Sequence, residues 1–241
     1  MLRRNSQIQE VQKLYPVKQM VSELIGLDEI QWGRYAFCHE PLERKFTDSQ
    51  KEEYTGKAFS CGRQEAREIR GKYPSLSLRE IVKECGFTLD TPDLPTGGGH
   101  VIFAQYTEPD EILIFRDCVK KAAGLIEREK LEHYFTEEKI EELLLAHELF
   151  HGIEYQKKKS IFTQTERIEL WRKPFSNRSR IICLSEMAAM AFAGELAQSS
   201  FSPYVLDVFL MYSYNKEAAC ALYEEIMEEA GAEKRKEEMP C

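Results

Sequence analysis

Residues 139–158 read KIEELLLAHELFHGIEYQKK and carry the strongest helix signal in the chain. Thr136 is a suitable N-cap just upstream, and the acidic first turn favours the start of a helix because it complements the positive end of the helix dipole. Within the segment, the pentapeptide HELFH places His147 and His151 four residues apart. On an α-helix this spacing puts both imidazoles on one face, about 6 Å apart along the axis. The two rings can therefore reach a single ion, and the spacing suits zinc.

Glu148 follows the first histidine and is turned about a third of the way around the helix. From there its carboxylate can reach a metal-held water from the side without itself being a ligand. The preceding LLLA and the pair Leu149 and Phe150 give the motif the apolar setting that a buried metal helix requires. An HExxH pattern arises by chance in about one such sequence in a hundred. The competing interpretation is a pair of histidines on a solvated helix face.

A catalytic zinc takes three protein ligands and leaves a fourth position for water. The residues after His151 lack the third histidine of the HExxHxxGxxH extension, so the third ligand is expected on another segment. Glu186 is the best candidate, because it lies in the apolar run ICLSEMAAMAFA, where an unpaired carboxylate would be costly to bury. The alternatives for this glutamate are a position at an exposed edge or a pair with a nearby arginine such as Arg180. Glu195 and Glu154 remain as reserve ligands, and Glu154, three residues after His151 on nearly the same face, could instead support that histidine from behind the metal.

Outward from this segment, the pattern predicts a mostly helical chain with a small sheet. Two β-rich runs, HVIFAQY at 100–106 and ILIF at 112–115, are joined by a short polar connection and predict an antiparallel pair. The glycines at 97–99 lack the context of a phosphate-binding loop and are interpreted as a flexible entry to a strand. Residues 157–177 are expected to be irregular. Helices are expected at residues 18–27, 48–73, 78–86 (capped by Ser77 and ended by Gly86) and 178–198, with one or two more within 203–230.

The composition is that of an ordinary globular protein, with 43% hydrophobic residues in a chain of 241, enough to bury a core. A net charge of −8 argues against direct nucleic-acid binding, and it disfavours the alternative that residues 75–90 form half of a DNA-binding helix-turn-helix. No run approaches the ~18 apolar residues of a membrane span, and the first twenty residues lack a secretory apolar segment. Seven cysteines without a CxxC pair are expected to be reduced thiols rather than a disulfide framework or a thiolate zinc site. We therefore expect a soluble cytoplasmic protein without membrane association.

The motif HELFH, followed by SEMAAMAFAGEL at 185–196, resembles the ImmA/IrrE family of gluzincin-type metallopeptidases. In that family, HExxH is followed by a glutamate on an alanine-rich helix that ends in a Phe-Ala pair. Upstream, SLSLREIVKECGFTL at 75–89 is similar to the small helix that precedes the family's first strand. The similarity extends over about residues 76–198.

The resemblance implies a zincin-like α+β fold, mostly helical, with a small antiparallel or mixed sheet beside the HExxH helix. It also implies an edge strand near residues 101–106 that holds an extended substrate by strand addition. The expected organisation is an N-terminal helical region at 1–75, a metallopeptidase domain at 76–231 and a charged tail at 232–241. Family members act on repressor proteins, so the resemblance implies a transcriptional repressor as substrate.

Taken together, the motif and the resemblance predict a zinc metallopeptidase that hydrolyses a peptide bond in a protein substrate. Zinc is expected on His147, His151 and Glu186, with Glu148 as the catalytic base that takes a proton from water and gives it to the leaving amine. The alternative is a non-proteolytic metal-binding regulatory protein that uses the same pocket to bind a partner. The donor to the tetrahedral oxyanion is left open among four residues: His133, Tyr155, Tyr106 and Tyr212.

Overall fold

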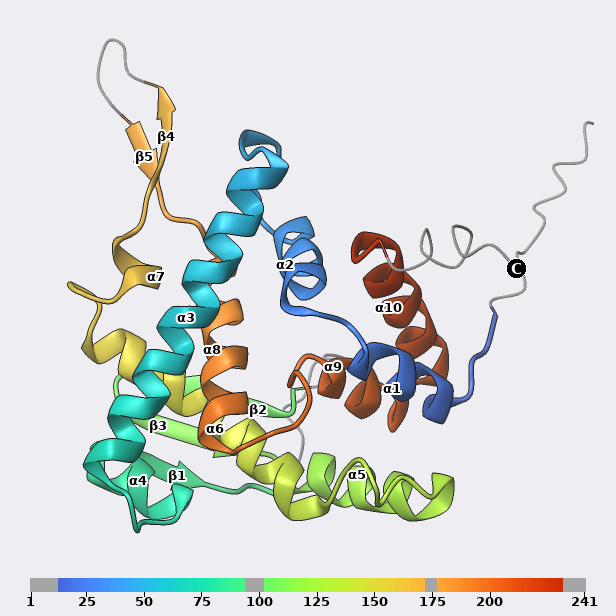
Figure 1. Cartoon of the computed structure of the whole chain (residues 1–241). Coiled ribbons are helices and arrows are strands. Elements are labelled where there is room, and N and C mark those ends of the chain that lie inside the picture. Colours follow the sequence, from blue (N-terminus) through green and yellow to red (C-terminus); the bar gives the residue numbers. More distant parts are fainter. Residues whose placement is uncertain (1–12, 94–101, 172–176, 232–241) are drawn as a thin grey trace, which may run out of the picture.

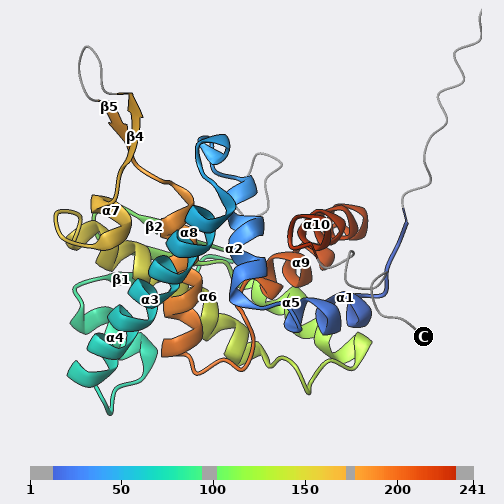
Figure 2. The ribbon, with the colours of Figure 1, turned by 45° about the horizontal axis from the view of Figure 1, so that its top comes forward.

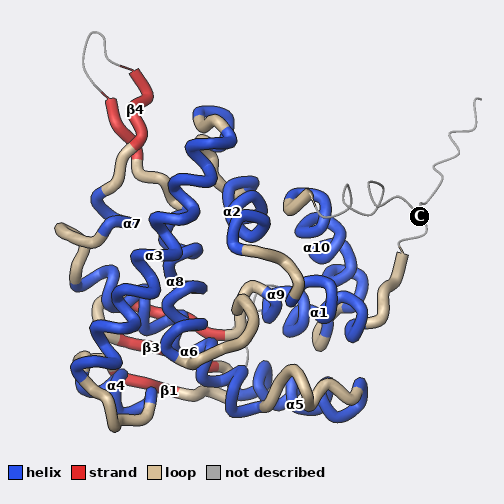
Figure 3. The backbone as a smooth tube through the Cα atoms, in the orientation of Figure 1, coloured by secondary structure: helices blue, strands red, loops and turns tan. Residues whose placement is uncertain are grey.

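The computed structural model describes residues 13–93, 102–171 and 177–231, and most of these residues are helical (Figures 1 and 3). The helices are α1 (Val17–Ile25), α2 (Glu29–Cys38), the 3-10 turn η1 (Glu43–Lys45), α3 (Asp48–Lys72), α4 (Leu78–Glu84), α5 (Arg116–Glu129), α6 (Glu137–Gln156), α7 (Phe162–Thr165), α8 (Cys183–Leu196), α9 (Val205–Tyr212) and α10 (Lys216–Glu229). The strands are β1 (Thr88–Asp90), β2 (Ala104–Thr107), β3 (Glu111–Ile114), β4 (Ile168–Trp171) and β5 (Asn177–Ser179). The prediction of a mostly helical chain with a small mixed sheet is confirmed.

Strand β3 is the centre of a three-stranded sheet with the order β1-β3-β2. β2 runs antiparallel to β3, with Tyr106 opposite Ile112, as the two β-rich runs predict. β1 runs parallel to β3, with Leu89 opposite Ile112, so the sheet is mixed. In the part of the chain that the structure describes, the outer side of β2 pairs with no further strand. β2 is therefore an edge strand, whose outward backbone groups are a template for pairing.

Helix α6 lies between this sheet and α8, and α3 lies along the far side of α8 (Figures 1 and 2). The ring of Phe150 on α6 contacts the ring of Phe192 on α8, with 5.5 Å between centroids. The backbones of α3 and α8 are close to each other, because a Cβ at Gly62 would lie 2.1 Å from the carbonyl oxygen of Ala188. Helix α8 is thus held between two helices and is buried on most sides, as its alanine- and methionine-rich sequence predicts.

Several helices begin where the sequence predicts a cap. Thr136 accepts a hydrogen bond from the backbone N–H of Lys139 and starts α6. Ser77 and Glu80 form a capping box at the start of α4, and Gly86, with a φ of 87°, follows its end. A residue with a side chain is strained at such a φ, so the prediction that this glycine ends the helix has a physical basis. Local hydrogen bonding therefore fixes both ends of α4.

The sequence pattern does not predict α2, α5, β1 or the β4–β5 hairpin. The expectation of an irregular stretch at 157–177 is wrong, because α7 and β4 lie within it. β4 and β5 pair with a register shift between Glu169 and Trp171, and strands this short and irregular show no alternating pattern. The hairpin projects from the body of the molecule (Figure 1). Because β5 occupies residues 177–179, α8 begins at Cys183 rather than at residue 178.

The described helices of residues 13–75 share one hydrophobic cluster with the rest of the chain. Met20 on α1 and Trp32 on α2 are fully or almost fully buried in this cluster, as are Phe150 and Phe192 of the central helices. The expected strand entry at residues 97–99 and the expected charged tail at 232–241 lie outside the described residues. Among the residues described, no helix combines the length and the apolar character needed to cross a membrane.

Candidate metal centre

Helix α6 holds the HELFH motif rigidly because the residues on its other faces are buried. Leu149 and Phe150 are fully buried, and Leu143 and Ala146 are almost or fully buried one turn earlier. The side chains of His147 and His151 are 17% and 19% exposed, so they lie at the surface of the core rather than on a solvated helix face. This placement disagrees with the competing interpretation of a solvent-facing histidine pair.

Three donor groups from two helices converge at this point. Nε2 of His147 lies 3.1 Å from Nε2 of His151. Oε2 of Glu186, on α8, lies 3.4 Å from Nε2 of His147, and its Oε1 lies 3.5 Å from Nε2 of His151. Within the described ranges, these three residues form one of two groups whose donor atoms are close enough to hold a metal ion. The structure thus brings together the three ligands that the sequence predicts.

Glu186 lies in the first turn of α8, and a distant residue fixes that turn. No local side chain caps α8. Instead, the buried carboxylate of Glu40 accepts hydrogen bonds from the backbone N–H groups of Ile182 and Cys183, at 2.6 and 3.1 Å. The side chain of Glu186 itself is 54% exposed. The expectation that Glu186 is buried is therefore wrong. Its side chain faces the open side of the site, whereas most other residues of α8 face the core.

The ring of His151 is supported by a second carboxylate. Nδ1 of His151 lies 3.4 Å from Oγ of Ser185 and 3.9 Å from Oε2 of Glu154. Ser185 Oγ donates a hydrogen bond to Glu154 Oε2 at 2.8 Å, and Thr163 Oγ1 donates to the other oxygen of this carboxylate. The Glu154 side chain is only 8% exposed. Groups of this kind orient a ligating histidine and increase its basicity.

The electrostatics of the site favour a charged pair. Burial lowers the pKa of His147, but the hydrogen bond and charge of Glu186 outweigh it and raise this pKa to about 9. Burial raises the pKa of Glu186, whereas its hydrogen bond to His147 and the charges of both histidines lower it to about 2. Solvent reaches half of the Glu186 side chain and screens the pair. A divalent cation would replace the proton that the pair holds.

Two residues of the segment around α9 lie near the site and are not predicted from the sequence. Asp207 lines a small cavity of about 120 Å³ together with His147 and Glu148. Burial raises the pKa of Asp207 to about 7, although the charge of His147 opposes the shift. The hydroxyl of Tyr204 is buried without a hydrogen-bond partner among the described residues. Burial and the charge of Glu186 raise the pKa of the Tyr204 hydroxyl well above its usual value.

The candidate metal centre opens into a cleft of about 620 Å³. Both histidines, Glu148 and Glu186 line it, so the base that the sequence predicts faces the same space as the three donor groups. Residues 104–106 of the edge strand β2 form another wall. The remaining lining residues are Glu108, Glu154, Tyr155, Lys158, Gln164 and Arg180. An extended chain lying along β2 would therefore pass the donor groups.

The reserve ligands have other partners. Glu195 accepts a hydrogen bond from Nε of Arg67 at 2.8 Å, and Glu154 supports His151 as described above. Arg180, the alternative partner of Glu186, donates to Oε1 of Gln164 at 2.6 Å. Glu195 and Arg180 are therefore engaged away from the donor groups, whereas Glu154 lies behind His151, as its spacing in the sequence allows.

Of the four candidate oxyanion donors, Tyr106 and Tyr155 line the cleft. His133 and Tyr212 are not among its lining residues. The hydroxyl of Tyr106 donates to the carbonyl oxygen of Pro109 at 2.6 Å. Tyr155 is thus the better placed candidate, because the hydroxyl of Tyr106 is engaged with the backbone.

Comparisons of the chain with protein-family models, with curated proteins and with solved structures find no match.

Proposed function

We propose that this chain is a zinc-dependent metallopeptidase whose metal is held by His147, His151 and Glu186. The observation that carries the proposal is the set of separations between the three donor groups, 3.1, 3.4 and 3.5 Å. Ligands at ~2.1 Å from a tetrahedral zinc ion are about 3.4 Å from one another. Two imidazole nitrogens and one carboxylate are also the donor set of many catalytic zinc sites. The residues present therefore fit the ion.

The roles of the protein residues follow from their places in the cleft. Zinc, when bound, supplies positive charge that polarises a peptide carbonyl and increases the acidity of water. Glu148 is the general base: it takes the proton from the attacking water and passes it to the leaving amine. Ser185 and Glu154 keep the ring of His151 in place. Tyr155 is the proposed donor to the oxyanion of the tetrahedral intermediate.

The shape of the cleft supports an extended protein segment as substrate. Strand β2 lines the cleft beside the metal ligands and has an unpaired outer side in the described part of the sheet. A substrate segment can add to such an edge through backbone hydrogen bonds, which do not depend on its sequence. The carbonyl group of the substrate bond to be cleaved would then lie beside the three proposed metal ligands. The likeness of the sequence to the ImmA/IrrE family makes a cytoplasmic repressor protein the proposed substrate class.

The variant Glu148→Gln tests the proposal. It removes the base but leaves the three ligands, so it is expected to bind zinc with the affinity of the parent while peptide cleavage falls by about 100-fold or more. A fluorogenic peptide library is the probe for cleavage, and metal analysis after gel filtration measures occupancy. Glu138→Gln, at an exposed position in the first turn of the same helix, is the matched control and should retain activity. Full cleavage by Glu148→Gln contradicts the mechanism, whereas a zinc-loaded parent that cleaves no peptide supports the non-proteolytic regulatory alternative.

A further inference from the structure

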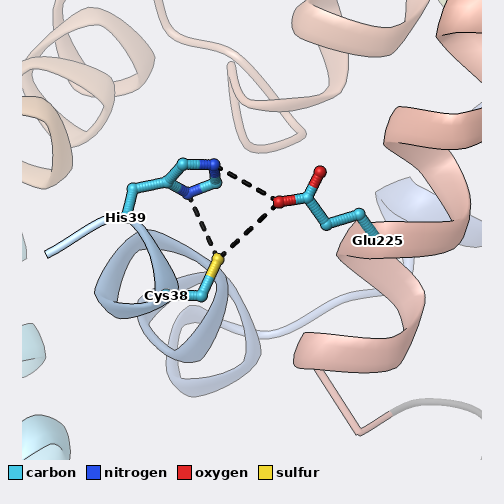
Figure 4. A group of neighbouring side chains, drawn as sticks. All are labelled: Cys38, His39 and Glu225. Carbon is cyan, nitrogen blue, oxygen red and sulfur yellow. Dashed lines mark hydrogen bonds and ion pairs between the residues drawn. The ribbon is translucent and has the colours of Figure 1, made fainter. Parts of the chain in front are cut away.

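A second group of potential metal ligands lies outside the candidate metal centre, where α2 ends beside α10 (Figure 4). Cys38 is the last residue of α2, and His39 is its C-cap. Glu225 comes from α10, almost two hundred residues later in the chain. Figure 4 shows the three side chains turned toward one another across the gap between the two helices. None of the three belongs to the helices that carry the candidate metal centre.

The candidate ligand atoms of these three residues lie within 4.8 Å of one another. Oε1 of Glu225 lies 3.4 Å from Nε2 of His39 and 4.0 Å from Sγ of Cys38. Zinc–sulfur bonds of ~2.3 Å and zinc–nitrogen or zinc–oxygen bonds of ~2.1 Å place tetrahedral ligands about 3.3–3.8 Å apart, so Sγ of Cys38 and the Glu225 carboxylate must approach each other slightly as an ion binds. Thiolate, imidazole and carboxylate are all zinc ligands, and the sulfur favours a borderline or soft ion over magnesium or calcium.

The surroundings of His39 orient its ring for this role. Nδ1 of His39 lies 3.3 Å from the carbonyl oxygen of Tyr35, one helical turn earlier, and 3.2 Å from Sγ of Cys38, so the sulfur must turn from Nδ1 toward Nε2 to share an ion with it. A ring that donates its Nδ1 hydrogen to this carbonyl presents the lone pair of Nε2 to Glu225. Ligating histidines commonly have such a backbone partner on the other ring nitrogen. The edge-on contact with the ring of Tyr35, at 5.0 Å between centroids, restricts the imidazole further.

The local charge also favours a cation. Cys38 lies at the end of α2, where the helix dipole is negative. It lines a hollow of about 730 Å³ that gives solvent access, and five carboxylates share this hollow with two basic residues. Those carboxylates belong to Glu43, Asp48, Glu52, Glu228 and Glu229, whereas the basic residues, Arg34 and Lys51, are already paired with Glu52 and Glu43. An entering divalent cation therefore meets an excess of negative charge.

We propose that Cys38, His39 and Glu225 form a second metal site, which binds a divalent transition-metal ion such as zinc through Sγ, Nε2 and a carboxylate oxygen. The thiol proton of Cys38 leaves to solvent as the sulfur–metal bond forms. The bound ion joins the end of α2 to α10. This site is independent of the proposed peptidase activity, because it shares no residue with the cleft.

Cobalt(II) distinguishes the two sites, because a cobalt–thiolate bond gives a near-ultraviolet charge-transfer band that a site of two histidines and a glutamate cannot give. Titration of the full chain with cobalt(II) is expected to produce this band, and zinc(II) is expected to remove it by displacement. Cys38→Ser should abolish the band. Cys61→Ser, which changes another half-buried cysteine outside both clusters, should leave it unchanged.

The ligand variants His39→Gln and Glu225→Gln are expected to weaken cobalt binding at this site by about 100-fold or more, while peptide cleavage stays at the level of the parent. A parent protein without the charge-transfer band overturns the proposal whatever the variants do. A band that survives in Cys38→Ser overturns it as well, because the thiolate would then come from another cysteine. If the protein proves to have no peptidase activity, the cobalt–thiolate band still tests the second site, because the band does not depend on cleavage.

Discussion

Ser185 Oγ donates a hydrogen bond to Glu154 Oε2 at 2.8 Å, and this contact joins α8 to α6 directly beside the ring of His151. Thr163, from α7, donates to the other oxygen of the same carboxylate. Three helices thus meet at one carboxylate that lies behind a proposed metal ligand. This arrangement makes the orientation of His151 depend on residues that do not touch the ion.

The variant Ser185→Ala tests this dependence. It removes the donor to Glu154 and leaves the carboxylate and the ring of His151 less restricted. Zinc affinity is expected to fall by about 10- to 100-fold. Competition with a chromophoric chelator measures the affinity, and Ser160→Ala, which removes an exposed hydroxyl bonded to a backbone carbonyl, is the control. An affinity within about twofold of the parent would show that His151 does not need this support.

Glu40→Ala tests the cap of α8. The variant leaves the backbone N–H groups of Ile182 and Cys183 without their acceptor, in a partly buried setting for Ile182 and a buried one for Cys183. The free energy of unfolding is expected to fall by about 1–3 kcal/mol. Urea titration measures the change. Glu43→Ala, which removes a neighbouring carboxylate from a partly exposed ion pair with Lys51, should cost less than about 1 kcal/mol. Equal losses in the two variants would contradict the capping role.

Gly62→Ala and Gly56→Ala compare two glycines of the same helix. A Cβ at Gly62 meets the backbone of α8, so the helices must separate, and the variant is expected to lose about 1–3 kcal/mol of stability. A Cβ at Gly56 meets nothing within 4 Å, so that variant should gain about 0.5–1 kcal/mol from helix propensity. Thermal unfolding followed by circular dichroism measures both. A stabilised Gly62→Ala would show that α3 and α8 are not in backbone contact.

The candidate site is partly predictable because some of its signals are local in the sequence. The helical spacing of His147 and His151 brings their rings together whatever the rest of the fold does. Glu186 stands out as an acidic residue in an apolar helix, even though it is half exposed. Thr136 and Ser77 cap the helices that they precede, because a cap bonds to residues only three positions away.

The remaining parts depend on contacts between distant segments. Glu40 caps a helix that begins more than 140 residues later, so no local pattern links the two. Asp207 and Tyr204 approach the site only because α9 packs beside it, although an aspartate within the apolar run VLDVFLMY is itself a local signal of a functional or paired carboxylate. β1 is three residues long and is a strand because β3 pairs with it. Tertiary packing decides such elements, and a single sequence does not display it.

Zinc binding is expected to depend on pH through His147. The pKa of this residue is raised from its ordinary value of 6.5 to about 9, so the metal-free site holds a proton up to that pH. The pKa of Glu186 is lowered to about 2, so its carboxylate is already ionised at neutral pH. One proton must therefore leave as zinc binds, and the apparent affinity should rise about tenfold per pH unit between 7 and 9.

Calorimetry in buffers with different ionisation enthalpies measures this proton release. The Cys38→Ser variant is the protein to use, because the proposed second site would release a proton of its own. One proton per zinc at pH 7 and a flat affinity above about 9 are expected. Zinc binding without proton release at pH 7 would show that His147 does not hold a proton in the metal-free protein.

A crystal structure of the zinc-loaded protein, with anomalous diffraction measured at the zinc edge, shows which residues hold the ion. We expect an anomalous peak between α6 and α8, at about 2.0–2.2 Å from Nε2 of His147, Nε2 of His151 and a carboxylate oxygen of Glu186. A peak bound by other residues, or no peak at this position while zinc saturates the protein, would contradict it.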